Sequence, residues 1–133
     1  MCYARYLVAY NQQKIFSFKY DPVNYPTDTV NKIVREYTDT LVADSLNVLL
    51  NGQAIPKYVP ADNGNIPADT LIASTNSFAK YFYTLSVVGS TITITVYANP
   101  KFRYSEYTGG AAEYNVQFSS TDLLYIDYTI TVP

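Results

Sequence analysis

The chain has 133 residues, the length of a single domain, and we treat residues 1–133 as one unit. Hydrophobic residues make up 48% of it, enough to build a core and too many for a disordered chain. Charged residues make up only 15%, the net charge is −2, and 15 of the residues are tyrosine. There is no histidine, and Cys2 is the single cysteine.

This composition excludes several classes of function. Without histidine the chain lacks the commonest general base and the commonest metal ligand, so Ser-His-Asp hydrolases and ordinary zinc sites are excluded. One cysteine cannot form an intrachain disulfide; it is either a core thiol or a link to another chain. A sequence pI near 4.8 argues against nucleic acid as a partner. No apolar run approaches the length of about 18 residues needed for a membrane-spanning helix. We expect no cofactor and no bound metal.

The N-terminal segment predicts a β-hairpin. Residues 2–10 are apolar but rich in tyrosine, which is typical of a first strand and not of a secretory signal peptide. The polar residues 11–13 predict a turn, and residues 14–20 predict the returning strand. In that strand Phe16 and Phe18 alternate with polar residues, so we expect them to face the core.

One segment predicts a helix, over residues 27–43. Its apolar residues are spaced three and four apart, and Thr27 is a suitable N-cap after a proline. The apolar residues of this stripe are Val30, Ile33, Val34, Tyr37 and Leu41. Residues 46–50, followed by Asn51-Gly52, predict a strand entering a type I′ turn. A helical extension ended by glycine is the alternative for that stretch.

Residues 56–69 contain three prolines and predict a long exposed loop, with a short edge strand over residues 57–59. Asp62, Gly64 and Asp69 give it a faint likeness to a calcium-binding loop. The loop has too few carboxylates for such a site, so we interpret it as a solvated turn.

Two hairpins are predicted in the C-terminal half. Residues 78–88 and 90–97 are joined by Gly89-Ser90, and Ile92, Ile94 and Val96 share one face of the second strand. Residues 114–118 and 124–132 are joined by a turn over residues 119–122. Short strands at this spacing predict a mainly β protein, an antiparallel sandwich of jelly-roll type with the helix in a connection. The alternative is an α+β fold with the helix packed on the sheet.

The tyrosines are the candidate functional residues. A sheet face lined with tyrosine can form a protein interface or stack on a sugar, because the ring gives a large contact area at low entropic cost. It can also be partly buried within the domain itself. Tyr81 and Tyr83 alternate with Phe82, so we place them on the face away from the core. The candidate platform comprises Tyr81, Tyr83, Tyr97, Tyr104, Tyr107 and Tyr125.

The acidic residues provide no recognisable catalytic pair. Glu106 and Glu113 flank two glycines, and Asp127 lies in a predicted strand, where we expect it to pair with a lysine or arginine of a neighbouring strand. We therefore predict that the protein is not an enzyme.

A small β domain with few charges suits a structural or assembly protein acting through contacts with copies of itself or with other structural subunits. We expect it in a virus particle (capsid, decoration or minor component) or in an extracellular surface filament, made without a signal peptide. The alternative is a module that binds carbohydrate on a tyrosine-rich sheet face.

Overall fold

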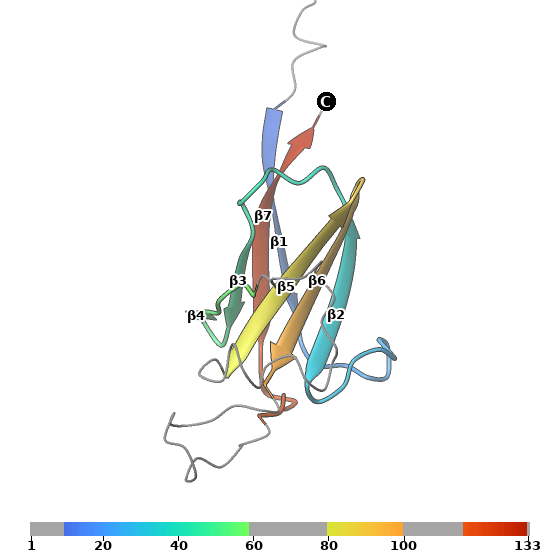
Figure 1. The fold of residues 1–133 in the computed structure, drawn as a ribbon, viewed down its shortest axis with the longest axis vertical. Helices are drawn as coiled ribbons and strands as arrows, with labels where there is room; N and C mark the ends of the chain where they lie inside the picture. The colour runs from blue at the N-terminus through green and yellow to red at the C-terminus, as the bar shows by residue number, and fades with distance from the viewer. Residues whose placement is uncertain (1–9, 59–79, 100–115, 133) are drawn as a thin grey trace, which may run out of the picture.

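The computed structural model describes residues 10–58, 80–99 and 116–132. These residues form seven strands. The strands are β1 (Tyr10–Phe18), β2 (Lys32–Thr38), β3 (Asn47–Leu50), β4 (Gln53–Ala54), β5 (Tyr81–Val88), β6 (Thr91–Ala98) and β7 (Leu124–Val132). One sheet has the order β1-β7-β3-β4 and the other the order β2-β6-β5, and every pairing is antiparallel (Figure 1). The prediction of a mainly β protein is confirmed.

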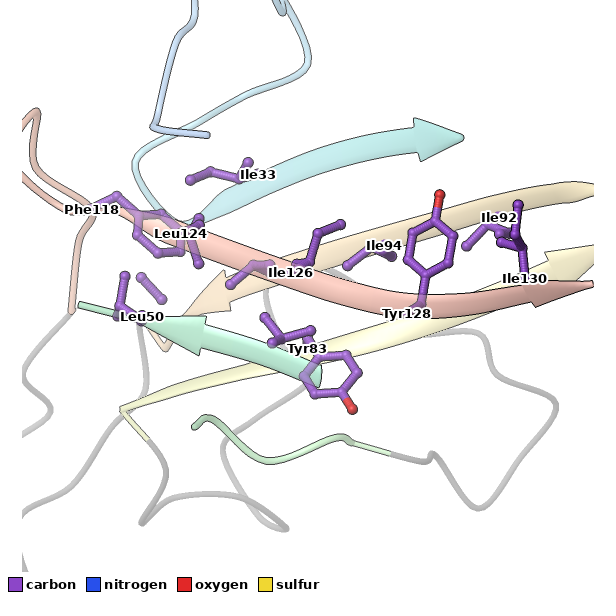
Figure 2. Packing of buried hydrophobic residues seen from close by; sticks show 13 residues of the cluster. Ile33, Leu50, Tyr83, Ile92, Ile94, Phe118, Leu124, Ile126, Tyr128 and Ile130 are labelled. Atoms are coloured by element: carbon purple, nitrogen blue, oxygen red, sulfur yellow. The ribbon is translucent and has the colours of Figure 1, made fainter. Parts of the chain in front are cut away.

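One hydrophobic cluster takes residues from both sheets (Figure 2). Alternate residues of β7 and β6 are buried, because successive side chains of a strand point to opposite faces. In β6 these are Ile92, Ile94 and Val96, as predicted. The buried residues of β7 are Leu124, Ile126, Tyr128 and Ile130. Within this cluster the hydroxyl of Tyr128 donates a 2.7 Å hydrogen bond to Asp39.

The predicted helix over residues 27–43 is wrong, because β2 occupies its middle and no helix occurs among the residues described. The alternative in which that helix packs on a sheet fails for the same reason. Ile33 is buried and Tyr37 packs against the core, so the true period is two. Arg35 occupies the position between them and is also buried. Because the inward residue Arg35 is charged, the sequence does not show the alternation of apolar and polar residues that predicts a strand.

Arg35 is tolerated there because it is paired. Its Nη1 and Nη2 atoms lie 2.8 and 3.0 Å from the two carboxylate oxygens of Asp28, in a bidentate ion pair. The guanidinium also donates to the carbonyl groups of Val34 and Lys19. Its Cζ atom lies 3.5 Å from the centre of the Tyr25 ring. This ion pair fixes the connection between β1 and β2 against the edge of β2.

The predicted N-terminal hairpin is also wrong in its described part. β1 runs without a break through residues 11–13, where a turn was expected, and pairs along its whole length with β7, from Tyr10 opposite Val132 to Phe18 opposite Leu124. The polar residues do not mark a turn because they lie on the exposed part of an edge strand. Residues 2–9, including Cys2, lie outside the described residues. Phe16 and Phe18 pack against the core, as predicted.

The glycine turns are confirmed. β5 and β6 form a hairpin in which Gly89 has a φ of 61°. β3 and β4 pair across Asn51 (φ 51°) and Gly52 (φ 85°), the two positive values that a type I′ turn requires. Residues 47–50 are therefore a strand, and the helical alternative is excluded. Of the predicted edge strand over residues 57–59, Lys57 forms a parallel bridge with Tyr83. Residues 59–69 lie outside the described ranges.

The last predicted hairpin is not formed by the described residues. β7 pairs with β1 and β3, so both of its edges are occupied by strands far away in the sequence. Residues 116–118 are instead hydrogen-bonded to other segments. The Val116 amide donates to the Asn99 carbonyl at 3.0 Å, and the Phe118 amide donates to the Val30 carbonyl at 2.7 Å. The turn at residues 119–122 is present, with the Asp122 amide bonded to the Ser119 carbonyl.

Candidate interaction surface

Two of the candidate tyrosines face the core instead of the surface. Tyr83 is only 8% exposed and belongs to the main hydrophobic cluster, and Tyr81 packs against that cluster with its ring 5.8 Å from Phe118. Burial raises the pKa of both phenols above its ordinary value. The predicted orientation of β5 is therefore wrong, because the alternation alone cannot show which aromatic set faces the core.

Phe82 lies on the opposite face of β5, in a small aromatic cluster of its own. It is 1% exposed and contacts Tyr97 and Tyr58. The ring of Tyr97 is stacked on it with centroids 4.9 Å apart, and the ring of Tyr58 meets it edge-on at 5.6 Å. Register explains the stacking, since Phe82 is directly opposite Tyr97. Burial raises the pKa of Tyr97, and a hydrogen bond with Thr84 partly offsets that rise.

Of the remaining candidates, Tyr125 lies on the other sheet and two lie outside the described residues. Tyr125 is half-buried, is directly opposite Ser17 and Leu49, and alternates with the core residues of β7 on the outward side. Tyr104 and Tyr107 lie outside the described residues. The platform of six tyrosines is therefore not one surface: two of its members face inward, and Tyr97 and Tyr125 are on different sheets.

Beyond Tyr97, the outer side of the β2-β6-β5 sheet carries an array of hydroxyl groups that we call the hydroxyl face. It comprises Thr84 and Ser86 of β5 and Thr91, Thr93 and Thr95 of β6. Register places Thr84 opposite Thr95 and Ser86 opposite Thr93, so the hydroxyls form rows across two strands. The charged side chains on this side of the three strands are Lys32 and Glu36, both on the edge strand β2.

The outer side of the other sheet is similar. β1 contributes Asn11, Gln13, Ile15 and Ser17, and β7 contributes Tyr125, Asp127, Thr129 and Thr131. Asp127 carries the one charge of this set. We predicted a lysine or arginine partner for it, but its carboxylate accepts a 2.9 Å hydrogen bond from the side-chain amide of Asn47 on β3. Asp127 is half-buried on the outer side of the sheet, and this partner is a neutral amide.

Two carboxylates of the described residues are held in contacts within the fold. In the segments that the structure describes there is no group of three or more histidine, cysteine, aspartate or glutamate side chains that could hold a metal. The Asp28 carboxylate is paired with Arg35, and the Asp39 carboxylate accepts a hydrogen bond from Tyr128. Glu106, Glu113, Asp62 and Asp69 lie outside the described ranges. No helix long and apolar enough to cross a membrane occurs in those ranges either.

No family model, no curated protein and no solved structure matches the chain. Its function must therefore be inferred from its own residues.

Proposed function

We propose that the protein is a non-enzymatic structural subunit that works through protein–protein contacts, as a component of a virus particle or of an extracellular surface filament. Its architecture is an antiparallel β-sandwich of jelly-roll type. The observation that supports this proposal is the nearly uncharged outer side of both sheets. On the strands that the structure describes, only Lys32, Glu36 and Asp127 interrupt a surface of hydroxyl, amide, aromatic and aliphatic side chains.

Burying such a surface against another subunit requires little desolvation free energy. Transfer of a charged side chain out of water carries a penalty of several kcal/mol unless a partner compensates it, and the hydroxyl face has no charge to transfer. The centres of protein interfaces are depleted in charged residues and enriched in tyrosine and phenylalanine. Threonine and serine can exchange hydrogen bonds with water for hydrogen bonds with a partner at similar energy.

The same surface is insensitive to its surroundings. With no histidine in the chain, no side chain titrates between about pH 5.5 and 8 at ordinary pKa values. Contacts made by hydroxyls and apolar groups are also weakly screened by salt, unlike contacts between exposed charges. A subunit that must hold an assembly together outside a cell benefits from both properties.

The experiment is to measure the mass of the pure protein by light scattering over a range of concentrations. We expect self-association, and we expect Thr93→Lys and Thr95→Lys to weaken it, since each places a charge at the centre of the hydroxyl face. Ser120→Lys, at an exposed turn, is the matched control and should leave the mass unchanged. A protein that stays monomeric at every concentration and binds no other structural subunit would overturn the proposal.

A carbohydrate-binding module is the second candidate function, favoured by the position of Tyr97. Its aromatic ring is half-buried beside the threonine hydroxyls of β6, a combination that can stack on a sugar ring and hydrogen-bond to its hydroxyls. This candidate requires a monomer that binds a glycan on an array, with Tyr97→Ala abolishing binding. Absence of glycan binding, together with concentration-dependent association, would eliminate it.

A further inference from the structure

The edges of the two sheets differ in how well they are protected. β4 has only two residues. On β5, the amide and carbonyl of Tyr83 are bonded to Pro56 and Tyr58, at 3.0 and 2.8 Å. On β2, the amide of Val34 is bonded to Asp28 and its carbonyl to Arg35. These contacts block the middle of β2 and the start of β5 against any added strand.

β1 is the long edge without such protection. On β7, the Thr131 amide donates to the Thr40 carbonyl, and the Thr129 carbonyl accepts a hydrogen bond from the Val42 amide. The main-chain amide and carbonyl groups of these odd-numbered residues therefore point away from β1. The even-numbered residues of β7 therefore bond to β1, and by alternation the main-chain groups of Asn11, Gln13, Ile15 and Ser17 point outward. Within the described ranges, these four outward-pointing sets of amide and carbonyl groups have no other hydrogen-bond partner.

The side chains of β1 also lack the usual devices that prevent edge pairing. Natural edge strands carry prolines, bulges or several charges. β1 has nine residues, no proline, and Lys14 as its single charge. Ile15 is an exposed apolar side chain at 56%. The Nζ atom of Lys14 lies 4.0 Å from Oδ1 of Asp39, on the core side of the strand.

We propose that β1 pairs antiparallel with β1 of a second copy of this chain, about a two-fold axis at Ile15. This inference rests on the proposed assembly function, and it adds to the hydroxyl face a second contact, made by the edge of the other sheet with a second copy of the chain. In that register Ile15 lies opposite its own copy, and Gln13 lies opposite Ser17 in both directions. The outward main-chain groups of Gln13, Ile15 and Ser17 then satisfy one another, and two four-stranded sheets become one continuous sheet.

Charge disfavours the neighbouring register and permits a second copy of the chain as the occupant. Centring the axis one residue earlier would place Lys14 directly opposite its copy, which is unfavourable, whereas the Ile15 register places Lys14 opposite Phe16. The four outward side chains are uncharged, and the net charge of −2 gives little repulsion between copies. A second copy therefore meets an edge that is complementary to itself.

Disulfide trapping tests the register directly. In a Cys2→Ser background, Ile15→Cys places two thiols on Cα atoms about 5.5 Å apart across the axis, which is within disulfide range. We expect mild oxidation to give a covalent dimer. Val88→Cys in the same background is the control, because Val88 is 74% exposed and lies on the other sheet. A monomeric Ile15→Cys product, or equal cross-linking of both variants, would overturn the proposal.

Light scattering separates this inference from the proposed function. Ile15→Lys should weaken dimerisation by about tenfold or more, because it places two like charges opposite each other, and Val88→Lys should not. An unchanged melting temperature shows that the Ile15→Lys variant is folded. If the wild-type protein associates but Ile15→Lys associates equally well, pairing through β1 is wrong and assembly through other surfaces stands. A strictly monomeric wild-type protein overturns pairing through β1, and it overturns the proposed function only if the protein also binds no other structural subunit.

Discussion

The buried ion pair between Asp28 and Arg35 gives the sharpest stability prediction, through Asp28→Asn. The two side chains are 0% and 3% exposed. The substitution keeps the shape of the side chain but removes its negative charge, leaving the guanidinium of Arg35 uncompensated in the protein interior. The Asp28 carboxylate also accepts the amides of Asp21 and Val34, at 3.1 and 3.2 Å, and one amide oxygen cannot serve all of these donors.

The magnitude follows from the cost of an unpaired buried charge. Removing one partner of such a pair typically costs about 3–5 kcal/mol. The ring of Tyr25 and the carbonyl of Lys19 remain in contact with the guanidinium, so we expect a loss near the lower end, about 3 kcal/mol. Among the described residues, Nε of Arg35 has no hydrogen-bond partner, so this atom provides no contact that would compensate the loss. Total stabilities of domains are only about 5–15 kcal/mol, so this is a large fraction.

Urea denaturation measures the effect. With an m-value of about 2 kcal/mol per molar, the midpoint should fall by about 1.5 M. The double variant Asp28→Asn/Arg35→Met should recover part of the loss, because replacing both partners of a buried pair removes the unpaired charge. A midpoint shift below about 0.5 M for Asp28→Asn, or a double variant less stable than the single one by more than 1 kcal/mol or so, would refute this account of β2.

Three further predictions concern the core, a turn and the alkaline range. Ile126→Ala should cost about 2–5 kcal/mol in urea denaturation because it opens a cavity between the sheets, whereas the exposed Val88→Ala should cost almost nothing. Gly89→Ala should lower stability by about 1 kcal/mol because φ is 61°, although the space is open, and Gly89→Asn should lose less; equal losses would contradict a conformational cause. Burial raises the pKa of Tyr37 to about 12 and raises that of Tyr128, with its hydrogen bond to Asp39 adding to the rise. The unfolded chain therefore loses these protons first, so stability should fall as pH rises from about 10 towards 12, by up to about 1.4 kcal/mol per pH unit for each tyrosine. The slope should be shallower in Tyr128→Phe, and a flat profile above pH 10 would be inconsistent with burial.

The candidate surface was only partly predictable. The strict alternation of β6 correctly placed Ile92 inward and left Tyr97 on the outer side. On β5 the residues facing both ways are aromatic, so local pattern could not decide between Tyr83 and Phe82. Packing decided it: Tyr83 meets the other sheet, whereas Phe82 is buried against Tyr97 and Tyr58. The free edge of β1 could not be predicted at all, because it depends on which strand pairs with which.

Local signals in the sequence alone therefore determined the β class, the turn at Gly89 and the inward face of β6, and they favoured the turn at Asn51-Gly52. These features depend on residues adjacent in the chain. Glycine permits a positive φ, and the alternation of apolar and polar residues gives a strand one apolar face that must be buried. The tertiary structure decided the rest. Residues 32–38 are a strand and not a helix because Asp28 compensates the inward Arg35, and β1 runs straight because β7 offers it nine residues to pair with. Such choices depend on partners distant in sequence, and the free energy of burial and pairing outweighs local propensity.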